Sequence, residues 1–134
     1  MKEIQFYVLI TVLAALEGGL VLAGILPPIS SYSIGTVILS LAGLAAVAYM
    51  GRAFSNEGIK KVAIKGTIAG TVSIAIILLS AAIGIMVNVP VLGMSIPSAY
   101  LPLAFISIAV PNIILFTIFA VFGALIAKKL HKNA

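Results

Sequence analysis

The feature that most constrains this chain is the length of its apolar runs, which are interrupted by proline and glycine turns and almost never by charge. Four such runs cover residues 4–26, residues 34–50, a stretch that begins within residues 52–61 and ends near 87, and residues 103–130. A helix of about 20 residues crosses the roughly 30 Å hydrocarbon core of a bilayer, and each run is of that order or longer. We therefore predict an all-α chain of four long hydrophobic helices.

The composition indicates what must surround these helices. Hydrophobic residues make up 63% of the 134 residues, and charged residues only 8%. A small folded protein buries only about two thirds of the surface that its unfolded chain exposes, so this much apolar surface must also meet lipid or other copies of the chain. The length suits one domain, and we treat residues 1–134 as a single hydrophobic four-helix domain. The first run is about twice as long as the core of a signal peptide, so we expect it to be retained as a helix.

Turn residues separate the runs and predict the topology. Pro27 and Pro28 end the first run, Gly51 lies at the end of the second, and Asn88 with Pro90 ends the third. We expect two hairpins in an up-down-up-down path. Pro111 lies inside the last run and predicts a kink there, because proline lacks the N–H group and its ring clashes with the preceding turn.

Charge is gathered at one end of this path, where the N-terminus, the middle turn and the C-terminus meet. The basic residues that share this end are Lys2, Arg52, Lys60, Lys61, Lys65, Lys128, Lys129 and Lys132. The connections at the opposite end, residues 27–33 and 88–102, carry no charge. An ordinary membrane protein with both termini in the cytoplasm would look like this. A surface that binds the phosphates of nucleic acid without sequence preference would look the same, and the two interpretations are compatible.

Glu17 is the one ionisable residue deep inside an apolar run, which makes it a candidate for function. It would serve either as the proton-coupling acid of a transporter or as a hydrogen-bonding group between helices, within one chain or between subunits. Small residues four positions apart predict close helix contacts. The residues that we assign to helix packing are Glu17, Gly18, Gly19, Gly66, Gly70, Gly84 and Gly123.

The sequence offers little for catalysis. It has no cysteine, a single histidine and three acidic residues, and it contains no catalytic triad, phosphate-binding glycine loop or cluster with metal-ligand spacing. We therefore expect no enzymatic activity, no cofactor and no metal ion.

A short, cysteine-free and very hydrophobic chain with two helical hairpins, an uncharged end and a lysine-rich end resembles the major capsid proteins of spindle-shaped archaeal viruses. The resemblance covers the whole chain and rests on architecture and composition. It implies a structural virion protein, inserted in the host membrane before assembly, of which many copies form a helical or spindle-shaped shell. The basic ends would face DNA in the lumen, and contact with lipid is compatible with this arrangement.

An alternative resemblance is to the small multidrug resistance transporters, which are also short four-helix proteins with one glutamate in the first helix, here Glu17. The aromatic residues that this family uses around its substrate are missing from the second and third runs, apart from Tyr49 near an end. A subunit of a larger membrane complex is a third interpretation.

Overall fold

The computed structural model describes residues 2–27, 29, 33–91 and 98–133, with the backbone alone at 98 and 131–133. Four long α-helices account for most of these residues: α1 (Glu3–Leu22), α2 (Ile34–Ala53), α3 (Ile59–Val87) and α4 (Leu101–Asn133). Two short 3₁₀ turns, η2 (Ser55–Glu57) and η3 (Ser98–Tyr100), precede α3 and α4. The described part of the chain contains no strand, which confirms the predicted all-α fold.

Local chemistry explains where the helices begin and end. The Ser33 hydroxyl accepts a hydrogen bond from the Thr36 N–H at 3.3 Å and thereby caps the start of α2. Gly58, with φ of 101°, precedes α3, and Asn88 ends that helix in the left-handed conformation. The first helix ends at Leu22 rather than at residue 26, because the chain turns at Gly24, where φ is 77°.

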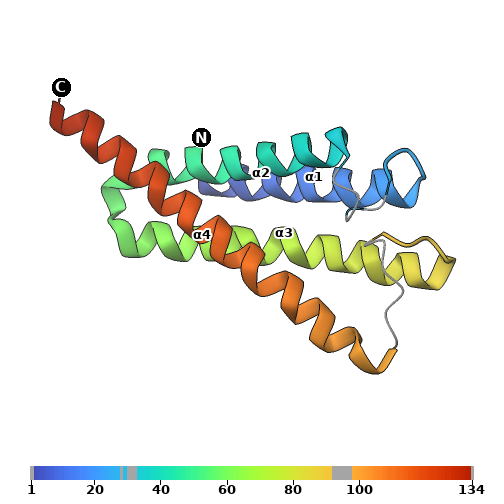
Figure 1. Ribbon diagram of the computed structural model, residues 1–134. Helices are drawn as coiled ribbons and strands as arrows, with labels where there is room; N and C mark the ends of the chain where they lie inside the picture. Colours follow the sequence, from blue (N-terminus) through green and yellow to red (C-terminus); the bar gives the residue numbers. More distant parts are fainter. Residues whose placement is uncertain (1, 28, 30–32, 92–97, 134) are drawn as a thin grey trace.

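The contacts between helices agree with the predicted up-down-up-down path. Helix α1 packs against α2 and α3, and α4 packs against α2 and α3. Figure 1 shows both chain ends and the α2–α3 turn toward one end of the molecule, with the other two connections at the opposite end. In the same view α4 crosses the other helices obliquely. Helix α4 continues without interruption through Pro111, and a kink at this residue stays a prediction.

The interior consists of three apolar clusters placed along the bundle. The largest lies toward the end that holds the chain termini and is built around Phe6, Val47, Met50, Val62 and Phe116. Smaller clusters follow near the middle, around Ile74 and Ile77, and near the opposite end, around Val21, Ala81 and Val91. The bundle is therefore held together most firmly at the end where the charges gather.

The outer surface of the bundle is apolar on all four helices. Each helix is long and apolar enough to span a membrane, and the share of residues buried in the apolar stretch is only 28–39% in α1, α2 and α3 and 11% in α4. Large hydrophobic side chains are exposed on every helix. Such flanks require lipid or further protein around them.

Candidate functional site

Exposed cations crowd the end of the bundle where both termini emerge. We call this surface the basic end and define it by the six described side chains that are exposed there: Lys2, Arg52, Lys60, Lys61, Lys128 and Lys129. They come from the start of α1, the end of α2, the start of α3 and the end of α4. The predicted gathering of basic residues is therefore observed in the fold (Figure 1). The side chain of Lys132 lies outside the described residues.

Lys65 differs from these cations because its side chain is only 12% exposed and is held by the chain itself. Its Nζ lies 2.6 Å from Oε2 of Glu3 and 3.7 Å from Oε1 of Glu57, and it stands 4.9 Å from the centre of the Phe54 ring. The Tyr7 hydroxyl donates a hydrogen bond to Glu3 at 2.9 Å. Lys65 thus ties α1 and the η2 turn to α3, and we do not count it among the cations that face outward.

The basic end has the chemistry of a non-specific polyanion surface. Lysine and arginine neutralise phosphates through charge, which carries no sequence information. The six side chains are spread over four helix ends rather than gathered around one recess. Such an arrangement suits an extended backbone of repeated negative charges, such as DNA, better than a single small anion.

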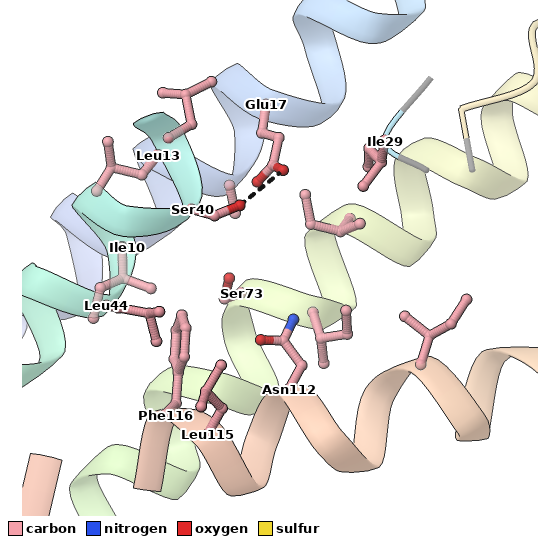
Figure 2. A pocket seen from close by; sticks show the side chains of 16 residues that line it. Ile10, Leu13, Glu17, Ile29, Ser40, Leu44, Ser73, Asn112, Leu115 and Phe116 are labelled. Atoms are coloured by element: carbon pink, nitrogen blue, oxygen red, sulfur yellow. Dashed lines mark hydrogen bonds between the residues drawn. The ribbon is translucent and has the colours of Figure 1, made fainter. Parts of the chain in front are cut away.

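A second candidate site is a partly open cavity of about 230 Å³ in the middle of the bundle, which we call the central cavity. All four helices line it. Its walls are mainly apolar, and four polar side chains interrupt them: Glu17 from α1, Ser40 from α2, Ser73 from α3 and Asn112 from α4. Figure 2 shows Glu17 and Ser40 on one wall and Ser73 and Asn112 on the other, with their polar atoms directed into the space between.

Glu17 is satisfied only weakly in this position. The Ser40 hydroxyl donates a hydrogen bond to Oε1 of Glu17 at 3.4 Å, near the limit for such a bond. Among the described residues Glu17 makes no ion pair, since the carboxylates paired with Lys65 are those of Glu3 and Glu57. The sequence identified Glu17 but missed its three polar companions. The signal that could have found them is a polar residue inside each of the other apolar runs.

Several of the glycines assigned to helix packing lie at close contacts. A Cβ atom on Gly66 would stand 2.6 Å from the Ala120 Cβ of α4, and one on Gly70 would stand 2.9 Å from the Phe116 Cβ of α4. Gly18 faces the Ser80 side chain on α3.

Gly123 and Gly84, which we also assigned to helix packing, differ in what they contact. Gly123 faces the backbone of Ala48 on α2, whereas Gly84 faces the segment that follows its own helix, at Val91. Gly19 is exposed and has no other atom near its missing side chain, so it makes no close contact with the described part of the chain. Gly51, which faces the backbone of Ala120, was not assigned to packing in advance although it lies at the α2–α4 crossing.

A comparison of the chain with protein-family profiles, curated proteins and solved structures finds no match. The basic end, the apolar flanks and the central cavity are therefore the features that bear on function.

Proposed function

We propose that this chain is a structural virion protein, of which many copies assemble through their apolar flanks into a helical or spindle-shaped shell of the kind made by spindle-shaped archaeal viruses. The observation that carries the proposal is the separation of surfaces on one small bundle. Exposed cations occupy one end, the opposite end is uncharged, and the flanks between them are apolar on every helix. Copies placed side by side would form a layer with one basic side and one neutral side.

The flank of α4 supplies a continuous contact surface for such a layer. Leu103, Ile106, Val110, Ile114 and Ile118 are all exposed and follow one another at spacings of three and four residues. Residues at these spacings lie on one face of a helix. No described residue covers this face, and a neighbouring copy would bury it.

The basic side of the layer would hold DNA by its phosphates. Binding of this kind is independent of base sequence and weakens steeply with salt, because each neutralised phosphate releases a counterion. The basic ends of many copies would multiply the contacts along one DNA molecule.

Electron microscopy of the purified material tests the assembly. We expect ordered tubes or closed shells that contain nucleic acid and little lipid. Detergent-dispersed dimers with no ordered assembly would refute the coat proposal.

Charge reversal tests the role of the basic end. The double variant Lys60→Glu with Lys61→Glu is expected to assemble but to lose most of its DNA, because both side chains are exposed and neither supports the fold. The matched control, Lys60→Arg with Lys61→Arg, keeps the charge and is expected to retain DNA. Equal DNA content in the two variants would contradict a DNA-facing basic end.

The central cavity favours a second candidate, an integral membrane protein that couples transport to protons through Glu17. The basic end would then lie in the cytoplasm. In lipid vesicles Glu17→Gln should abolish proton-coupled flux, with Glu57→Gln, which changes a carboxylate outside the cavity, as the control. Vesicles in which the unaltered protein gives no flux would rule this candidate out.

A further inference from the structure

We propose that the central cavity binds a small organic molecule with an ammonium group at one end and a hydroxyl group at the other. The proposal rests on the cavity alone and holds whether the helices stand in a bilayer or in a shell. Its failure would therefore leave the coat proposal untouched.

The size of the cavity sets the size of the occupant. An apolar cavity of about 150 Å³ in another protein binds benzene, which has six carbon atoms. The central cavity measures about 230 Å³. In proportion, a molecule of roughly eight or nine non-hydrogen atoms would fill it.

The ammonium group is inferred from the wall formed by α1 and α2. The Glu17 carboxyl group lies among apolar side chains such as Leu13 and Ile77, and no described residue pairs with it as a cation. A carboxylate in such surroundings is unfavourable unless a positive charge with hydrogen-bond donors reaches it. An ammonium group supplies both, and its remaining donors can bond to the Ser40 hydroxyl oxygen, which lies beside Glu17.

The hydroxyl group is inferred from the facing wall, formed by α3 and α4. Ser73 and Asn112 point into the cavity, and neither is hydrogen-bonded to another residue that lines it (Figure 2). A carboxamide and a hydroxyl together both donate and accept hydrogen bonds, which matches an alcohol. Because the two polar pairs lie on opposite walls with apolar side chains between them, one bare metal ion would serve only one pair.

The way into the cavity lies between α2 and α4. These helices touch closely where Gly51 meets Ala120 and Gly123 meets Ala48, toward the basic end. Farther along, Ser40 on α2 and Leu115 on α4 line the cavity and are both exposed. A molecule can therefore enter sideways through this gap, without passing the basic end.

Three straight-chain probes of similar length test the inference. Aminohexanol carries both polar groups, hexylamine only the ammonium and hexanol only the hydroxyl. Isothermal titration calorimetry of the purified chain in detergent, with empty micelles as the blank, is expected to rank them in that order. Each polar group should contribute a factor of about ten in affinity, as a hydrogen bond to a charged group or two neutral ones would.

Variants locate the binding. Glu17→Gln should remove the preference for amines while Glu57→Gln, outside the cavity, should not. Ser73→Ala and Asn112→Leu should remove the advantage of aminohexanol over hexylamine and leave hexylamine binding in place. Circular dichroism confirms that each variant is folded. Heats equal to those of empty micelles, or an unchanged probe ranking in folded Glu17→Gln, would overturn the proposal.

Discussion

Because α2 and α4 cross closely at Gly123, we expect Gly123→Ala to lower the stability of the protein. The added Cβ would stand 2.8 Å from the carbonyl carbon of Ala48 and closer still to its oxygen. These are backbone atoms, which cannot rotate away as a side chain would, so one helix must shift. Overpacking of this kind destabilises a protein by about 1 to 3 kcal/mol.

Gly19→Ala is the matched control because it makes the same chemical change in a helix with open space around it. Alanine is intrinsically better than glycine in a helix by up to about 1 kcal/mol, and this gain applies to both variants. The difference in unfolding free energy between the two therefore isolates the steric effect at Gly123. We expect Gly123→Ala to be less stable than Gly19→Ala by about 1 to 3 kcal/mol.

The assay is reversible unfolding in mixed detergent micelles, followed by the loss of helical circular dichroism. A difference below about 0.5 kcal/mol, the range of an ordinary surface substitution, would refute the close backbone contact. The same pair of variants tests contacts between copies. If Gly19→Ala is at least as stable as the unaltered chain but no longer assembles, Gly19 lies at an interface between copies.

Two further predictions concern polar contacts between helices, and the same unfolding assay checks both. Lys65→Met should lower the unfolding free energy by about 1 kcal/mol, because α1 and the η2 turn lose a shared cation while their carboxylates stay partly hydrated. Lys61→Met, at an exposed position on the same helix, should change it by less than about 0.5 kcal/mol, and an equal effect of both would contradict this role of Lys65. Thr117→Val removes the 2.8 Å hydrogen bond to the Thr67 hydroxyl and should lower stability by about 0.6 kcal/mol, the average for such bonds between membrane helices. Thr71→Val, which loses only a bond within its own helix, is the control, and a loss as large as that of Thr117→Val would argue against the interhelical bond.

The sequence predicted the number, order and direction of the helices because the signals for them are local. Asn88 acts on its own segment of backbone and ends α3 as predicted, whereas α2 runs past Gly51 to Ala53. The shared end of the basic residues followed from the topology alone, since an even number of helices returns the chain to the side where it began. These conclusions needed no knowledge of which side chains touch.

The contacts between helices could not be predicted in the same way. Apolar residues occupy every face of these helices, so the pattern does not show which face is turned inward. Glycine spacing singled out Gly66 and Gly70, which lie against α4, together with Gly19, which faces open space, and it passed over Gly51. The central cavity was missed for a related reason, because Ser73 and Asn112 come together only when α3 and α4 pack.

The inward position of Lys65 changes the electrostatic field around the basic end. Glu3 and Glu57, the two carboxylate side chains at this end, are both turned toward one lysine and serve as its counterions. One of these two negative charges is therefore balanced internally, and the field that reaches an approaching polyanion combines the other with the six exposed cations of the basic end. One semi-buried ammonium group, by engaging both local anions, weakens the repulsion that they would otherwise direct at a phosphate chain.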